Sequence, residues 1–234
     1  MCGRFAFGSP KNTAGPFGPV HEWFEFDEFP LFESRFNIAP AQPVAIIRKD
    51  ERARSQFTHV LWGLIPSWAK DPDNHHRPIN ARCETAAEKP TFRNALRYRR
   101  CLVPANFFYE WKRYDKSRQP YAICMADEQP FAMAGLWEHW QGADGSEIET
   151  CAILTCRANE MMKQIHDRMP VILHRDDYGR WLDTDIQHAE KVQDLLTPFP
   201  ADQMDCYPVT QHVNSVKNED ERCLAREENT EFLF

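Results

Sequence analysis

Residues 100–137 read RCLVPANFFYEWKRYDKSRQPYAICMADEQPFAMAGLW, and this stretch decides the fold. It contains four short apolar or alternating runs, at Arg100–Val103, Phe108–Lys112, Tyr121–Met125 and Phe131–Trp137. Runs of this length that are rich in aromatic and apolar residues predict strands. Turn-forming residues such as those of 113–120 connect them without regular alternation with helices, so we expect a mainly antiparallel sheet.

The same patterns continue on both sides of this stretch. Further strands are predicted at Val44–Arg48, Phe57–Trp62, Cys151–Thr155, Val171–Leu173 and Cys206–Val209. Helical patterns are fewer and shorter, at Val20–Phe26, Thr91–Tyr98, Asn159–Ile165, Asp176–Leu182 and His188–Leu196, with Asn159 and Asp176 as N-caps. The predicted fold class is therefore α+β rather than a doubly wound parallel sheet.

Length and composition set the limits of the molecule. A chain of 234 residues with 42% hydrophobic and 12% aromatic residues can bury a substantial core, which excludes global disorder. No linker or repeat divides it, so we predict a single domain over residues 1–234, in which 218–234 form an acidic, partly ordered C-terminal tail. No apolar run is long enough for a membrane span and no signal peptide is recognisable, so we expect a cytoplasmic protein.

The eight cysteines do not have the spacing of a zinc site, and we expect no metal. Most of them, such as Cys101, Cys124 and Cys151, are predicted to be reduced thiols inside apolar strands. Cys2 is different because of its position. If Met1 is removed, the chain begins with an α-amine next to a thiol, and both groups are partly nucleophilic near neutral pH.

Two chemistries use such an aminothiol. The amine can condense with an aldehyde, after which the thiol closes on the imine carbon to form a thiazolidine. Alternatively, the thiolate can attack an amide carbonyl with the α-amine as its base, as in N-terminal-nucleophile amidases. Cys2 alone does not decide between these reactions and an unreactive residue at the second position.

Two further motifs carry groups that can transfer protons. Glu110 lies within the aromatic run FFYEW, where burial would raise the pKa of a carboxyl group and suit it to proton transfer. The alternative for Glu110 is an outward charge on an edge strand. His166 follows a short predicted helix in the motif QIHDRMP and is a candidate general acid and base near pH 7.

A basic segment covers residues 77–113. It has nine basic and three acidic side chains, a net charge of +6 in a chain whose total is −7, and the remainder therefore carries −13. Aromatic residues alternate with these charges, as in the surfaces that bind single-stranded nucleic acid. Asn80 and Arg82 fall in this segment, and the Arg82 guanidinium has the planar geometry that suits phosphate. For Arg97 and Arg99 we favour a solvated basic helix face that is paired with acidic residues elsewhere on the protein.

Together, these motifs resemble the SOS response-associated peptidase (SRAP) family. The resemblance rests on MCGRF at residues 1–5, FNIAP at 36–40, WGLIPSW at 62–68, INARCET at 79–85, RCLVPANFFYEW at 100–111, IHDRMP at 165–170 and VNSVKN at 213–218. It covers nearly the whole chain in the expected order. The resemblance implies a barrel-like β core with short peripheral helices.

The resemblance also implies a function, namely an abasic-site sensor on single-stranded DNA that removes Met1 and crosslinks the sugar aldehyde through Cys2. It assigns catalytic roles to Cys2, Asn80, Glu110 and His166. It implies that DNA is contacted by Arg4, Pro40, Trp68, Arg82, Phe92, Arg93 and Thr155. It implies no cofactor, a monomer, association with the nucleoid when DNA is bound, and replication or repair proteins as further partners.

Two other functions remain open at this point. One is an N-terminal-nucleophile amidase or glutaminase, in which Cys2 attacks an amide. The other is a non-enzymatic single-strand binding module, in which the basic segment acts and Cys2 is incidental.

Overall fold

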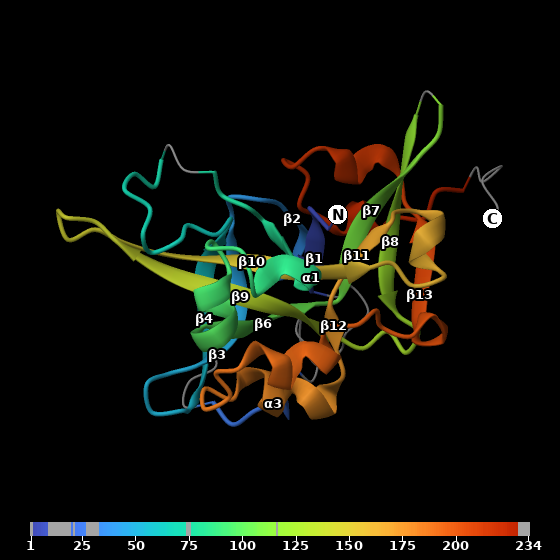
Figure 1. Ribbon diagram of the computed structural model, residues 1–234. Coiled ribbons are helices and arrows are strands. Elements are labelled where there is room, and N and C mark those ends of the chain that lie inside the picture. The colour runs from blue at the N-terminus through green and yellow to red at the C-terminus, as the bar shows by residue number, and fades with distance from the viewer. Residues whose placement is uncertain are drawn as a thin grey trace.

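The computed structural model describes residues 2–8, 20, 22–26, 33–73, 76–115 and 117–228 (Figure 1). Its centre is a closed five-stranded barrel in which the order of neighbours is β10, β4, β3, β6, β9 and again β10. These strands are β3 (Pro43–Lys49), β4 (Ser55–Trp62), β6 (Arg100–Ala105), β9 (Phe131–Gln141) and β10 (Glu147–Arg157). Every pair in the ring is antiparallel except β4 with β10. The prediction of a mainly antiparallel, barrel-like α+β fold is confirmed.

A second, fully antiparallel sheet packs beside the barrel. Its strands run in the order β13 (Met204–Pro208), β8 (Arg118–Met125), β7 (Phe107–Arg113), β1 (Phe5–Phe7) and β2 (Arg35–Ile38). Three short strands extend the barrel sheet, namely β5 (Asn80–Arg82) and β11 (Arg168–Pro170) on β10, and β12 (Ile172–Leu173) on β9.

The helices are short and peripheral, as expected. The α-helices are α1 (Cys83–Ala86), α2 (Arg93–Tyr98) and α3 (Tyr178–Leu182). The 3₁₀ helices are η2 (Met162–Gln164), η3 (Arg175–Asp177), η4 (Ala189–Leu195), η5 (Ala201–Gln203), η6 (Gln211–Asn214) and η7 (Glu221–Leu224). No helix in the described ranges combines the length and hydrophobicity that a membrane crossing requires.

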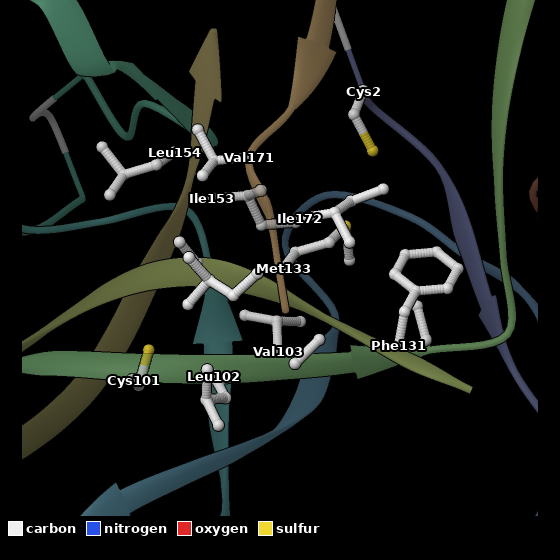
Figure 2. Close-up of a cluster of buried hydrophobic side chains, with 14 of the residues drawn as sticks. Cys2, Cys101, Leu102, Val103, Phe131, Met133, Ile153, Leu154, Val171 and Ile172 are labelled. Carbon is white, nitrogen blue, oxygen red and sulfur yellow. The ribbon is translucent and has the colours of Figure 1, made fainter. Parts of the chain in front are cut away.

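Apolar side chains of the barrel strands form the largest core cluster. Val103, Met133 and Ile153 come from three different strands and lie together in Figure 2. The barrel closes tightly because Gly135 on β9 lies opposite Cys101 on β6. A Cβ atom at Gly135 would lie 2.8 Å from the Cys101 Sγ, so a side chain at this position would push the two strands apart.

The predicted strands are confirmed, and the predicted helices only partly. The pattern at Thr91–Tyr98 becomes α2, and Asp176–Leu182 becomes η3 followed by α3. Asn159–Ile165 and His188–Leu196 form 3₁₀ helices instead of α-helices. The helix expected at Val20–Phe26 lies partly outside the described residues, and within them Phe26 forms a parallel bridge with Ser55.

The two predicted N-caps have different outcomes. The Asn159 Oδ1 accepts a hydrogen bond from the backbone N–H of Met162, the first residue of η2, at 2.9 Å, as a capping side chain does, although the residue directly before η2 is Met161. The prediction for Asp176 is wrong, because η3 starts after His174 and α3 after Asp177, and neither residue makes a side-chain cap bond.

The C-terminal segment packs on the second sheet as far as the structure describes it. Within residues 218–228, Cys223 and Leu224 are buried beside Tyr109, and Arg226 forms a β-bridge with Val209. The remainder of the tail lies outside the described residues.

Candidate functional site

Cys2 lies between the second sheet and the barrel. It lies three residues before the start of β1, and its side chain is fully buried at the edge of the barrel core, with the Sγ directed toward the apolar cluster (Figure 2). The Sγ lies 3.8 Å from the backbone oxygen of Arg4. Burial, and to a smaller extent the negative charge of Glu110, raise the pKa of the Cys2 thiol to about 12. The thiol is therefore protonated at neutral pH in this conformation.

Asn80 connects the barrel to the N-terminal strand. Its Nδ2 donates a hydrogen bond of 2.7 Å to the backbone oxygen of Cys2. The Asn80 Oδ1 is buried and has no hydrogen-bond partner among the described residues. The amide thus holds Cys2 with one end and presents an acceptor with the other, directly beside the residue that would carry the α-amine.

Glu110 is buried in the same region. It lies on β7, which pairs with β1 on one side and β8 on the other, and 4% of its surface is exposed. The neighbouring Tyr109 donates its backbone N–H to the Arg4 oxygen at 2.9 Å, which brings β7 against the N-terminal residues. The alternative of an outward charge on an edge strand is therefore wrong.

His166 lies in the turn between η2 and β11. Its Nδ1 accepts a hydrogen bond from the backbone N–H of Arg168 at 3.0 Å and lies 2.8 Å from the Asp167 Oδ1. The His166 side chain is 30% exposed, so a ligand can reach it. The described contacts bring Cys2, Asn80 and Glu110 together, and they connect His166 to Asp167 and Arg168.

The loop that carries Trp68 is closed at its base on β10. Strand β4 ends at Trp62, which is paired with Cys151 on β10, and the chain pairs with β10 again at Asn80 of β5, opposite Ile153. Gly63 opens this loop at a φ of +134°, a conformation that favours glycine. Trp68 is 54% exposed, so the loop presents an aromatic surface to solvent.

The residues expected to contact DNA differ in their accessibility. Pro40, Arg82 and Arg93 are exposed, and Phe92 is partly buried against the core. Thr155 is completely buried, and its backbone oxygen accepts a bond from Arg168 at 2.6 Å. Its side chain offers no surface to a DNA strand in this conformation, so its position does not support a direct contact.

Several basic side chains of the segment 77–113 form ion pairs or hydrogen bonds within the protein. Arg99 pairs with Glu138 at 2.9 Å, Arg97 donates to the Gln187 oxygen, and the buried Arg100 donates to backbone oxygens such as that of Trp181. The expected pairing with an acidic residue is found for Arg99, whereas the described bond of Arg97 is to a backbone oxygen. By contrast, Arg82 and Arg93 have no side-chain hydrogen bond or ion pair within the described part of the chain.

Arg4 is half-buried and already has partners. Its Nη1 donates to the Asn37 Oδ1 at 2.7 Å and to the Val213 oxygen at 2.9 Å, and its guanidinium lies over the Trp111 ring. Burial lowers the pKa of this guanidinium. These contacts place the C-terminal segment beside the N-terminus, as the red segment near the label N shows in Figure 1.

Sequence reasoning missed two polar groups that organise this region. Asn37 is fully buried, and its Nδ2 donates to the oxygens of Val213, Ser215 and Asn218. Glu84 accepts two hydrogen bonds from Arg168, at 2.6 and 2.8 Å. Asn37 lies in the FNIAP motif and Glu84 in the INARCET motif. The feature of the sequence that could have identified them was a polar residue within or directly after an apolar run.

In the described part of the chain, no group of three or more His, Cys, Asp or Glu side chains could hold a metal ion. Each of the eight cysteines, all of which are described, is a free thiol.

Comparisons of the sequence and the fold with known proteins point to one family. The family model for the SOS response associated peptidase (SRAP) matches residues 1–216. Two Bacillus subtilis proteins, the abasic site processing proteins YoqW and YoaM, are each 41% identical, over 93% and 97% of this chain and 96% and 99% of their own lengths. A crystal structure from Bacteroides thetaiotaomicron aligns with a TM-score of 0.75 at 30% identity, over 82% of this chain and 85% of the other. By its sequence, its barrel and the match of its family model, the chain belongs to the SRAP family.

Proposed function

We propose that this protein processes abasic sites in single-stranded DNA by capturing the sugar aldehyde covalently with Cys2. The observation that carries the proposal is the hydrogen bond from Asn80 to the Cys2 backbone, made next to the buried Glu110. Relatives at 41% identity over nearly their whole length are named abasic site processing proteins, which supports the same substrate here.

The proposed reaction begins with the removal of Met1. Hydrolysis of its peptide bond uses one water molecule, releases methionine and leaves Cys2 with a free α-amine. Glu110 is the group near this bond that can accept and return a proton, and Asn80 holds the Cys2 carbonyl in place.

The α-amine then attacks the aldehyde of the ring-opened abasic sugar. Loss of the aldehyde oxygen as water gives an imine, and addition of the Cys2 thiol to the imine carbon closes a thiazolidine. One C–N and one C–S bond form, and the thiol proton ends on the ring nitrogen. His166 supplies acid–base catalysis for opening the sugar ring and for reversing the crosslink.

The exposed groups around the site suit a single strand. Arg82 and Arg93 would bind phosphates and Trp68 would stack on a base, with Pro40, Phe92 and Arg4 beside them. We further propose that the protein acts as a monomer in the cytoplasm, is at the nucleoid when it is bound to DNA, and passes the crosslinked site to replication or repair proteins.

Two measurements test this function. Mass spectrometry of the intact protein should show the loss of Met1 and then an adduct at Cys2 after incubation with uracil-excised single-stranded DNA. Cys2→Ala should abolish the band that survives a denaturing gel, whereas Cys206→Ala, which removes the partly exposed cysteine, should retain it. A persistent crosslink in Cys2→Ala, or release of ammonia from glutamine in its place, contradicts the proposal.

A further inference from the structure

An ion pair joins three elements next to His166. The guanidinium of Arg168, which is nine-tenths buried, donates from Nη1 and Nη2 to the two carboxylate oxygens of Glu84. The same Nη2 donates to the backbone oxygen of Thr155 at 2.6 Å. Helix α1, strand β10 and strand β11 are thereby connected through one side chain. Bidentate pairs of this kind are the most strongly oriented ion pairs in proteins.

The backbone of Arg168 contacts the imidazole itself. Its N–H donates to the His166 Nδ1 at 3.0 Å, and a neutral imidazole accepts there only if its own proton is on Nε2. The Asp167 Oδ1, 2.8 Å from the same nitrogen, is an acceptor for the Nδ1–H that exists after protonation. The Nδ1 therefore has a partner in both protonation states. With both nitrogens protonated, the ring can give its Nε2 proton to a substrate oxygen, which leaves the remaining proton on Nδ1 beside the Asp167 Oδ1, and Nε2 can then take a proton back.

The position of the Arg168 guanidinium depends on its hydrogen bonds to Glu84. The Nε of Arg168 is buried without a hydrogen-bond partner among the described residues, so the guanidinium is fixed by Glu84 and by the Thr155 backbone and hydroxyl oxygens. The hydrogen bonds from Arg168 lower the pKa of Glu84 to about 2, which keeps the carboxylate charged at neutral pH. Removing this partner would leave a largely buried charge with little compensation.

We propose that Glu84 is a positioning residue for His166: through the bidentate pair with Arg168 it fixes the orientation of the imidazole and, in the resting neutral ring, the Nε2–H tautomer. The inference rests on the proposed function, because that function gives His166 its acid–base role. It adds a residue from the INARCET motif that touches neither Cys2 nor the imidazole in the described contacts.

A double-mutant cycle tests this role. Crosslinking rates are measured at saturating single-stranded DNA with one abasic site, for wild type, Glu84→Gln, His166→Ala and the double variant. Glu84→Gln should lower the rate about tenfold, because small displacements of a catalytic group have effects of this order or larger. In the His166→Ala background it should have no further effect. Dissociation constants for the same DNA, measured with Cys2→Ala present to prevent crosslinking, should be unchanged.

A matched control is available on the far side of the fold. Arg180 and Asp194 form a second bidentate pair, which is exposed and joins α3 to η4. Asp194→Asn should leave the crosslinking rate at the wild-type value. The ¹⁵N shifts of the His166 ring give a readout independent of activity, with one Nε2–H tautomer in wild type and a mixture in Glu84→Gln.

Other results would overturn the inference. An equal loss of rate from Glu84→Gln with and without His166 indicates a general structural role. Weaker DNA binding at an unchanged rate indicates that the pair contacts phosphate instead. If Glu84→Gln does not fold, Arg168→Lys replaces it in the same double-mutant cycle. Lysine keeps the positive charge but cannot donate two parallel hydrogen bonds to the Glu84 carboxylate. A crosslink that survives Cys2→Ala defeats the proposed function itself, and is distinguishable from a failure of Glu84 alone.

Discussion

At the scale of single residues, burial determines the order of the proposed chemistry. A thiol whose pKa is raised to about 12 is a poor source of thiolate, so in the proposed reaction we expect the α-amine to attack before the thiol. The α-amine created by removal of Met1 can form the imine, and the thiol can add afterwards as its proton passes to the nitrogen of the closing ring. Glu110 is the buried carboxylate close enough to influence the Cys2 thiol electrostatically.

Glu84 gives a prediction on acid stability. Its folded-state pKa of about 2 lies below the ordinary value of 4.5, so the ionised form is favoured by folding. The resulting stability is fully present above about pH 4.5 and is lost as the pH falls through 4.5 toward 2. Glu84→Gln should therefore be less stable than wild type at pH 7, and the difference should shrink below pH 4.5.

Urea unfolding at pH 7, 5, 4 and 3 measures this difference. The gap should be modest, because the Glu84 side chain is 41% exposed and solvent screens the pair. Glu88→Gln, which changes an exposed acid without an ion-pair partner among the described residues, is the control. A gap that is independent of pH contradicts the assignment.

At the scale of elements, distant motifs are joined by buried polar side chains. Asn37 on β2 anchors the loop that begins at Val213, and the same amide accepts from Arg4. Two of the sequence motifs, FNIAP and VNSVKN, thus form one structural unit beside the N-terminus. Loss of the Asn37 amide would leave several backbone oxygens without this donor, so we expect its replacement to be costly.

The β6–β9 contact gives a prediction on packing. Gly135→Ala should destabilise the protein by about 1–3 kcal/mol, because the new Cβ would lie 2.8 Å from the Cys101 Sγ and 3.0 Å from the Val103 Cγ2. Gly179→Ala on α3 meets no atom within 4 Å and should stabilise the protein by about 0.5–1 kcal/mol. Thermal or urea unfolding of the two variants distinguishes them, and equal effects would contradict the packing argument.

At the scale of the whole molecule, the charge is polarised and partly neutralised. Pairing of Arg99 with Glu138, and of Arg100 with backbone oxygens, removes charge from the basic segment. Arg82 and Arg93 remain exposed. An otherwise acidic surface disfavours general coating of DNA, while these arginines and Trp68 leave a small region that suits a single strand.

The salt dependence of DNA binding tests this distribution. Non-covalent binding is measured in a Cys2→Ala background. Arg82→Ala and Arg93→Ala should each make the negative slope of log K against log salt shallower by about 0.7, the value for one phosphate contact on single strands. Arg52→Ala, an exposed arginine at the turn between β3 and β4, should leave the slope unchanged. An unchanged slope in the first two variants places the DNA elsewhere.

The sequence by itself determined the class of the fold and most of the strands. Their alternating or apolar pattern is a local property that burial enforces, so runs such as Phe131–Trp137 were recognisable. It also singled out Cys2, Glu110 and His166, because their residue types and neighbours are unusual for structural positions.

Only the tertiary structure determined where the short strands and helices form and which distant side chains bond to each other. Strands β1, β2, β5 and β11 have three or four residues, and pairing with distant strands holds them in place. The 3₁₀ helices in place of two predicted α-helices have the same origin, since short helices depend on the surface against which they pack. Asn80 with Cys2 and Glu84 with Arg168 are separated by 78 and 84 positions, and only folding brings such groups within hydrogen-bond distance.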